Sequence, residues 1–506
     1  MDLFQRNQVR PFSIAHRCFL SVFVLAIALR LALFLLHHPF GAGSVAEPIL
    51  NGSDAVGDHY LGMAFSTHGN HLPRDPFLSA LRTPGYPLFI AAAYSLFGIK
   101  PWVVLLFQIV LDSVLAVLVA FLAAALADGL AHPLLEKGRI ASAAKFRSSR
   151  VASAEGLRSS RIALAAGLLY AVDPFAVLAA NELQSDSLFA LLLFTAFLLF
   201  YLYWSKGSVW HLVSSALLLA LSALVRPVAL YMVVFAVPFI LFGVKRAGAG
   251  PAGQRICHSL LYTVVFCLVL SPWLIRNRIV HGHFFLSTSP GYNTLVLYAA
   301  PVLARVQGTD EITAREAEKE RLRARYGGLM RSDPYRYCQI FRQRGVQIIR
   351  GHPRLFVEAC AAGILDLFFS IQKNSFSRFI GIERSGTDYV DSLARRGLLS
   401  TLQNYMRESG LRVILYTVFV LLLFLAEYSL ALAGIAALVR ARAFPLLIFL
   451  LLPVLYFVMI TGPAGMGRFK LPFVPYYLIL AAIGMMTLFR RTAVSTESVG
   501  EIDREL

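Results

Sequence analysis

The feature that most constrains this fold is a series of apolar runs, most of them close to 20 residues long, separated by polar connections. A helix needs about 20 apolar residues to cross the hydrocarbon core of a bilayer. We therefore predict an all-α polytopic membrane protein with about 10 transmembrane helices, and at most about 13. The predicted spans are 17–36, 101–127, 162–181, 186–204, 209–225, 227–244, 256–275, 412–438, 444–461 and 471–489.

Composition and charge agree with a membrane location. The chain is 57% hydrophobic, whereas soluble globular proteins contain roughly 45–50% apolar residues. Its net charge of +18 is explained by Lys and Arg in short connections, which are typical of cytoplasmic loops. Nucleic-acid binding is the other explanation for so basic a chain. The charges lie between apolar runs and form no basic face, which favours the membrane interpretation.

The charge bias also predicts which side each loop occupies. Both termini and the basic insert 128–161 are predicted to be cytoplasmic, while 38–98 and 276–410 face outward. The first apolar run is too long for a typical signal peptide and no small-residue cleavage site follows it, so we expect an uncleaved span. Residues 86–98 are too few to cross a bilayer and predict a juxtamembrane or re-entrant helix. The insert is interpreted as a topogenic linker, with contact to anionic lipids as the alternative.

The same pattern divides the chain into parts. Residues 1–275 form a transmembrane module, 276–410 a large external region, 411–491 the C-terminal transmembrane helices, and 492–506 a cytoplasmic tail. The external region contains a charged helix at 310–327 and an apolar stretch at 354–372 that predicts an interfacial helix. Cys338 and Cys360 are candidates for a disulfide in an oxidising compartment, but spacing alone does not establish one.

Known catalytic motifs are absent from the sequence. We find no Walker A sequence, no GxGxxG after a predicted strand, no HExxH and no GxSxG. Histidines occur in pairs, but without a third ligand these are weak evidence for a metal. We therefore expect no metal, no other cofactor and no ATP-driven step.

The predicted topology instead brings carboxylates and basic groups to the outer face. A carboxylate can accept a proton from an acceptor hydroxyl or amine, and arginines can hold a phosphate leaving group. Together they suit glycosyl transfer from a polyprenyl-phosphate sugar. The alternative is that these residues only cap helices and anchor them at the interface. The set comprises Asp54, Asp58 and Asp75 of a polar loop, then Glu182, Asp186, Arg226, Arg276, Asn277, Arg278, Arg468 and Lys470.

Six segments of the chain resemble landmarks of a known family. They are RTPGYPLFIAAAYSLFG, LAAGLLYAVDPF, ANELQSDSLFALLL, ALSALVRPVAL, SPWLIRNRIVHGHFFLSTSPGYN and GRFKLPFVPYYLILAAIG, in that order. The chain is similar to bacterial glycosyltransferase family 39 proteins of the GT-C superfamily, which includes protein O-mannosyltransferases and lipid A aminoarabinose transferases. The resemblance implies a conserved seven-helix module, juxtamembrane helices and a catalytic Asp in the first external loop, and a large loop after the seventh span.

The resemblance also implies roles for particular residues. The family's first-loop acidic residue is similar to Asp58, with Asp54 as the second candidate for the general base. Arg226, the Arg276-Asn277 pair, Arg468 and Lys470 match basic landmarks expected near the lipid phosphate. Glu182 matches an acidic position after the third span, and Asp186 is a further acidic candidate.

The function predicted from the sequence is an inverting glycosyltransferase. It would move a sugar from an undecaprenyl- or dolichyl-type phosphate to a protein, lipid or polysaccharide acceptor. We expect it in a bacterial inner membrane, with its active site facing the periplasm or exterior and without a nucleic-acid partner. The alternatives are a polyprenyl-lipid flippase or transporter that uses the arginines for binding only, and a non-catalytic subunit of an envelope complex. Internal repeat symmetry, often found in transporters, is not apparent in the sequence.

Overall fold

The computed structural model describes residues 10–36, 52–68, 75–136, 148–242, 251–370 and 411–505, and within these the chain is helical without any strand. The first half contains α1 (Arg10–Leu36), α2 (Gly52–His68), α3 (Pro76–Leu81), α4 (Gly85–Phe97), α5 (Pro101–Glu136), α6 (Ser148–Val172), α7 (Pro174–Ala180), α8 (Asp186–Lys206), α9 (Val209–Val225), η1 (Pro227–Met232), α10 (Val233–Phe242) and α11 (Ala252–His281). The second half contains α12 (Ser289–Asn293), η2 (Thr294–Ala299), α13 (Ala300–Gln307), α14 (Glu311–Tyr326), α15 (Leu329–Ser332), α16 (Pro334–Gly351), α17 (Pro353–Phe369), α21 (Leu411–Arg440), α22 (Phe444–Thr461), η3 (Gly462–Ala464), η4 (Gly467–Phe473) and α23 (Val474–Glu505).

Seven of the described helices are long and apolar enough to cross a membrane: Arg17–Leu36, Pro101–Ala127, Asp186–Lys206, Ala252–His281, Leu411–Arg440, Phe444–Ala464 and Gly467–Phe489. An eighth span arises if Ser159–Val172 and Pro174–Ala180, which are bent by 56° at a short break, are counted as one. The predicted all-helical, multi-pass architecture is therefore confirmed. The number of spans that meet these criteria is smaller than the ten predicted from the sequence.

Once the bent pair is counted as a span, the remaining difference comes from two shorter apolar helices. Val209–Val225 and Pro227–Phe242 coincide with predicted spans, but each falls short of about 20 residues. The second begins as the 3₁₀ helix η1 and continues as α10, which contains Pro238. Residues 86–98, predicted not to span, lie mostly in the 13-residue helix α4.

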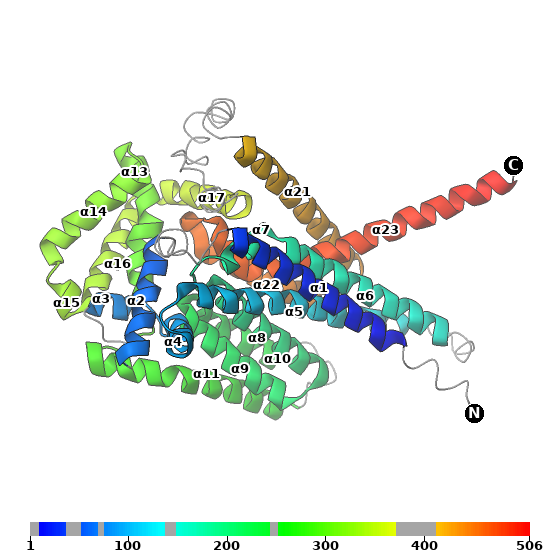
Figure 1. Ribbon diagram of the computed structural model, residues 1–506, viewed down its shortest axis with the longest axis horizontal. Helices are drawn as coiled ribbons and strands as arrows, with labels where there is room; N and C mark the ends of the chain where they lie inside the picture. The colour runs from blue at the N-terminus through cyan, green and yellow to red at the C-terminus, as the bar shows by residue number, and fades with distance from the viewer. Residues whose placement is uncertain are drawn as a thin grey trace.

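The basic insert 128–161 is partly helical. Helix α5 continues to Glu136 and α6 begins at Ser148, so both adjoining spans extend into the insert, whose residues 137–147 lie outside the described ranges. In Figure 1 the start of α1, the start of α6 and the end of α23 lie at one end of the molecule, and α13 to α16 lie at the other. Segments predicted to be cytoplasmic and segments predicted to be external therefore lie at opposite ends of the molecule.

A helical cap, defined here as residues 289–369 from α12 to α17, covers that other end (Figure 1). It has an apolar core of its own, to which Leu295, Val302 and Phe341 contribute. The predicted charged helix is α14, and the predicted interfacial helix is α17. Helix α3 packs against α15 and α16, so the segment after α1 is held between the cap and the bundle.

Close helix contacts depend on glycine at a few positions. Gly434 of α21 and Gly484 of α23 let the two backbones touch, because a Cβ at either position would lie about 2 Å from a carbonyl oxygen of the other helix. Gly85 allows the start of α4 to rest on the end of α9, where a Cβ would lie 2.7 Å from the Leu224 carbonyl oxygen. The second contact brings together the segments that carry Arg82 and Arg226, and Thr83 donates a hydrogen bond to the Val225 carbonyl there.

The five cysteines are all free thiols, so Cys338 and Cys360 form no disulfide here.

Candidate active site

A cavity of about 1520 Å³ lies where the helical cap meets the membrane helices. This volume exceeds the about 300–1,000 Å³ of typical small-molecule pockets, and leaves room for two reactants. Seven of the eleven candidate residues from the sequence contribute to its wall: Asp54, Asp58, Asp75, Glu182, Asp186, Arg226 and Arg468. They come from α2, from the residue before α3, from the segment between α7 and α8, from the start of α8, from the residue after α9 and from η4.

Asp54 and Asp58 lie on a helix, not in the polar loop predicted from the sequence. Both belong to α2, four residues apart, so their side chains lie on one face a single turn apart. Gly57 between them is therefore not at a turn. A Cβ there would lie 3.1 Å from a methyl group of Leu78, which indicates that Gly57 serves close packing of α2 against α3.

Asp58 is a buried carboxylate with a nearby cation. It is 5% exposed, and its Oδ1 lies 3.9 Å from Nε of Arg82. Burial raises the pKa of Asp58 to about 6, and the positive charge of Arg82 opposes this rise. A carboxylate with a pKa near neutrality is suited to accept a proton from a substrate at physiological pH.

Asp54 is held by two arginines. Nη2 of Arg82 donates a hydrogen bond to its Oδ1 at 2.6 Å, and Nη2 of Arg468 donates to its Oδ2 at 2.7 Å. Burial alone would raise the pKa of Asp54, but the charges and hydrogen bonds of the two arginines outweigh burial and hold it well below its usual range. Asp54 therefore stays ionised and is a poor proton acceptor, which separates it chemically from Asp58.

Arg82 reaches the cavity because the residues around it are fixed from three sides. The side chain of Asp75 caps α3 by accepting hydrogen bonds from two backbone N–H groups. Ser287 and Ser289 donate to the Leu81 carbonyl, and Thr83 donates to that of Val225 at 3.0 Å. The Arg82 side chain is thus placed by the cap and by α9 together.

Arg468 enters the cavity from the C-terminal helices. Its Nη1 donates to Oε1 of Gln184 at 2.9 Å while Nη2 binds Asp54. The Nε atoms of Arg468 and Arg82 are buried and have no hydrogen-bond partner among the described residues. Two guanidinium groups thus line one cavity, where their positive charge can attract an anionic ligand.

A second ion pair lies on the same wall. Nη1 of Arg226, the residue that ends α9, donates to Oδ1 of Asp186 at 2.5 Å. Glu182 is 6% exposed, and its backbone carbonyl accepts a hydrogen bond from Gln108. The pairing of Arg226 with Asp186 partly neutralises the arginine and keeps it close to the cavity.

Three predicted phosphate ligands are not among the residues of the cavity wall: Arg276, Asn277 and Lys470. Nη1 of Arg276 donates to Oδ1 of Asn277 at 2.8 Å, and its guanidinium lies over the Trp273 ring. Asn277 is fully buried and donates to the Phe285 carbonyl. This pair therefore secures the turn that follows α11. Lys470 is also fully buried, between aromatic rings.

Other residues of the wall were not assigned to the site by the sequence. Arg82 is the most important of them. Its position just before the Thr-Pro-Gly that begins the α4 segment is the sequence feature that could have indicated its place in the site. The cap contributes Arg315 and Lys319 of α14 and Arg342 of α16. Arg315 and Lys319 are both paired with Glu316, and nothing in the local sequence indicates that these surface charges face the cavity. Among the described residues, no three His, Cys, Asp or Glu side chains are grouped as metal ligands.

Comparison with known protein families gives one match. Residues 152–275 match the family described as dolichyl-phosphate-mannose-protein mannosyltransferase. The matched segment is about a quarter of the chain and runs from α6 into α11. It contains Glu182, Asp186 and Arg226 of the cavity wall. The match supports the predicted resemblance to the GT-C superfamily.

Comparisons with whole proteins add less. No curated protein sequence matches the chain. Among solved structures, the chain is similar to the archaeal oligosaccharyltransferase AglB from Archaeoglobus fulgidus, in complex with an inhibitory peptide and a dolichol-phosphate, with 15% sequence identity and a TM-score of 0.48. The similarity covers 96% of this chain but only 52% of AglB, so the chain spans about half the length of that structure.

Proposed function

We propose that this protein is an integral-membrane glycosyltransferase that uses a polyprenyl-phosphate sugar as donor. One observation carries the proposal: a buried carboxylate with a pKa of about 6, Asp58, shares a cavity with the guanidinium groups of Arg82, Arg226 and Arg468. A proton acceptor beside a phosphate-binding group is what sugar transfer from a lipid phosphate requires. The match of residues 152–275 to the mannosyltransferase family supports the same reaction class.

In this mechanism Asp58 is the general base. The acceptor oxygen attacks C1 of the sugar as its proton passes to the Asp58 carboxylate. A new bond forms between C1 and the acceptor oxygen, and the bond between C1 and the phosphate oxygen breaks. A single displacement of this kind inverts the configuration at C1.

The arginines stabilise the leaving group. As the bond from C1 to oxygen breaks, negative charge collects on the polyprenyl phosphate, which the guanidinium groups of Arg468 and Arg82 can bind. Asp54 remains ionised and keeps both guanidinium groups directed into the cavity. Arg226, held by Asp186, would supply further positive charge. The lipid phosphate is the leaving group, so no nucleotide takes part, and in this proposal arginines neutralise its charge in place of a metal.

The acceptor enters from the side of the cap in this proposal. The large volume and the polar residues of α14 and α16 suit an extended acceptor such as a protein segment, a lipid head group or a polysaccharide. We place the reaction on the periplasmic or outer face of a bacterial inner membrane, as the charge bias of the loops indicates.

A transfer assay tests the proposal. Purified protein in detergent or vesicles would be incubated with radiolabelled polyprenyl-phosphate sugars and a panel of protein, lipid and glycan acceptors. Label should appear on an acceptor, and Asp58→Asn should abolish the transfer. Lipid binding without transfer by any donor and acceptor pair would favour a flippase or transporter, and neither binding nor transfer would favour a non-catalytic subunit.

A further inference from the structure

Lys470 is buried in a position that its sequence context does not suggest. It belongs to η4, two residues after Arg468, but its side chain points away from the cavity and is fully buried. Its Nζ lies 3.4 Å from the ring centroid of Phe424 and 3.9 Å from that of Phe175, and it donates a 3.4 Å hydrogen bond to the Tyr428 hydroxyl. Such cation–π contacts are strong when the cation is removed from water.

Two buried carboxylates act on this lysine. Asp173 and Glu427 are both 1% exposed or less, and they are the acidic groups whose charges attract Lys470. Each retains one buried oxygen without a hydrogen-bond partner in the described structure, namely Oδ2 of Asp173 and Oε1 of Glu427. The positive charge of Lys470 therefore acts on two segments: α21 through Glu427, and the bend before α7 through Asp173.

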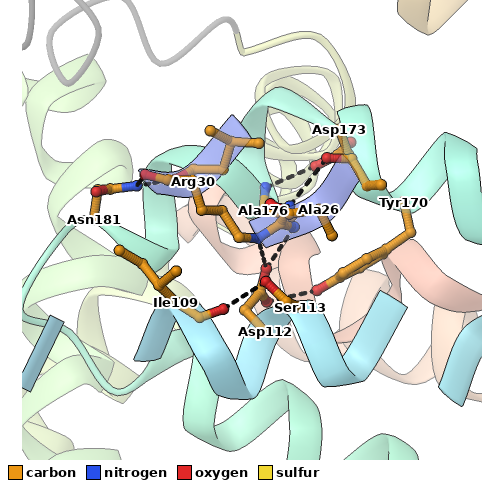
Figure 2. A network of polar contacts seen from close by, with 11 residues as sticks. Ala26, Arg30, Ile109, Asp112, Ser113, Tyr170, Asp173, Ala176 and Asn181 are labelled. Atoms are coloured by element: carbon orange, nitrogen blue, oxygen red, sulfur yellow. Dashed lines mark hydrogen bonds and ion pairs between the residues drawn. The ribbon is translucent and has the colours of Figure 1, made fainter. Parts of the chain in front are cut away.

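Asp173 joins this cluster to a second buried ion pair, drawn in Figure 2. Nε of Arg30 donates to Oδ2 of Asp112 at 2.6 Å, and Tyr170 donates to Oδ1 of the same carboxylate. Asp173 lies beside this pair and caps α7 by accepting from the Ala176 N–H at 2.8 Å. Helix α7 leads directly to Gln184, which is the hydrogen-bond partner of Arg468 in the cavity.

Lys470, Asp173 and Glu427 therefore lie next to both segments that meet at Arg468. These are η4 and the segment from α7 to Gln184. Helix α7 and η4 are in contact, and Gly467 rests against Phe175, where a Cβ would lie 2.5 Å from the ring. A lysine that anchors η4 two residues from Arg468 leaves little freedom for the guanidinium. We propose that Lys470 is a positioning residue, which with Asp173 and Glu427 fixes η4 so that Arg468 faces the donor phosphate.

This inference rests on the proposed function where it names the donor, but the positioning itself can be measured separately. Lys470→Met combined with Glu427→Gln removes one buried cation and one carboxylate charge, so that the net charge of the buried cluster is unchanged. The matched control, Arg344→Met with Glu318→Gln, removes the same kinds of groups from an ion pair between α14 and α16 in the cap, outside α7 and η4. Thermal unfolding of each variant records any general loss of stability.

The first readout is a mutant cycle with Arg468→Ala. A misplaced binding group can lower kcat/KM for the donor by on the order of 10-fold to 100-fold. We expect the Lys470 and Glu427 variant to show such a loss in the wild-type background and a change of about 2-fold or less when Arg468→Ala is present. The control pair should have the same effect in both backgrounds. Equal losses from the Lys470 and Glu427 variant in both backgrounds would overturn the proposal.

The second readout does not require activity. The thiol introduced by Arg468→Cys would be labelled with a charged, water-soluble reagent, and its modification followed by peptide mass spectrometry. The Lys470 and Glu427 substitutions should change its labelling rate by about 10-fold, because the segment is no longer held, while the control pair leaves it unchanged. An unchanged rate in both cases would refute positioning. If the wild-type protein shows no sugar transfer but the labelling rates at position 468 differ as expected, the proposed function fails and the positioning role of Lys470 stands.

Discussion

Arg468 and Asp54 lie 414 positions apart, yet Nη2 of Arg468 donates a hydrogen bond to Oδ2 of Asp54 at 2.7 Å. This contact joins the first segment after α1 to the C-terminal helices. The other oxygen of Asp54 accepts a hydrogen bond from Arg82, so one carboxylate orders two guanidinium groups. Asp58, one helical turn away, is left as the less strongly paired carboxylate of the cavity. The predictions below rest on this division of roles.

Asp58→Asn should abolish transfer while the protein still folds and binds the lipid donor. The amide keeps the size of the carboxylate but cannot accept the proton, and a general base typically contributes about 10²-fold to 10⁴-fold in rate. Initial rates with saturating donor measure the loss. Asp310→Asn is the matched control, since Asp310 caps α14 on the exposed surface and Asn is an equally good cap. Wild-type transfer by Asp58→Asn would remove Asp58 from the mechanism.

The activity should depend on pH through Asp58. Burial raises the pKa of Asp58 to about 6, and the base must be unprotonated to act. The kcat/KM for transfer should therefore be constant above this value and fall about 10-fold per pH unit well below it. A pH profile of kcat/KM that is flat between about pH 5 and 8 would contradict this assignment.

Arg82 should determine the pH at which kcat/KM begins to fall on the acidic side of the profile, here called the acidic limb. Its positive charge lowers the pKa of Asp58, so Arg82→Met should raise that pKa and move the limb to higher pH. Arg82→Lys retains the charge and should move the limb less. Full pH profiles of the two variants provide the measurement, and a limb at the same pH in all three proteins would show that another group titrates.

Asp54→Asn should weaken donor binding more than it slows the chemical step. The neutral amide can no longer hold Arg82 and Arg468 by charge, and hydrogen bonds to charged groups contribute about 1.5–3 kcal/mol. We expect donor KM to increase by about 10-fold or more, with a smaller change in kcat. If Asp54→Asn were inactive at saturating donor while Asp58→Asn retained full activity, the two carboxylates would exchange roles.

Arg468→Lys and Arg276→Lys should have different effects. Lysine keeps the charge but cannot reproduce the planar guanidinium, which in Arg468 contacts Asp54 and Gln184 at the same time. Donor KM should rise in Arg468→Lys. It should change little in Arg276→Lys, because Arg276 contacts Asn277 and Trp273 outside the cavity wall. Binding of radiolabelled donor to both variants provides the comparison, and a larger effect at Arg276 would return that residue to the donor site.

The membrane topology can be tested by labelling single cysteines in a background without native cysteine. A thiol introduced by Ser149→Cys in the basic insert should resist a membrane-impermeant reagent in intact cells, because the charge bias places the insert in the cytoplasm. A thiol introduced by Arg350→Cys, at the exposed end of α16 in the cap, should react. Labelling at position 149 in intact cells would reject this arrangement.

Much of the candidate site was predictable because its residues lie in recognisable local patterns. Asp54, Asp58, Glu182, Asp186, Arg226 and Arg468 flank apolar runs, where a charged residue must lie at a membrane surface or pair with another charge. Such patterns could not rank the two first-loop carboxylates. Their difference arises from the burial of Asp58 and from the two arginines that bind Asp54, of which Arg468 comes from the other end of the chain.

The direction of the Lys470 side chain is the property of the site that the sequence predicts least well. The Arg468 and Lys470 pair predicts two phosphate ligands, but in η4 their side chains separate, one into the cavity and the other between Phe175 and Phe424. Direction within a short 3₁₀ segment follows from packing against α7 and α21, which no local pattern encodes. Arg276 and Asn277 also lie outside the cavity wall where phosphate ligands were predicted. Packing again decides this, because Asn277 donates a hydrogen bond to the turn after α11.

By itself the sequence determined the helical class, the membrane location and most of the helices, because apolar runs long enough to cross a bilayer must satisfy their backbone hydrogen bonds internally. It also determined which charges lie at the ends of those helices. Only the tertiary structure decided which of these charges share a cavity, which carboxylate remains available to accept a proton, and which basic groups are buried as anchors. Those outcomes depend on contacts between segments hundreds of residues apart, where burial and pairing set the state of each charge.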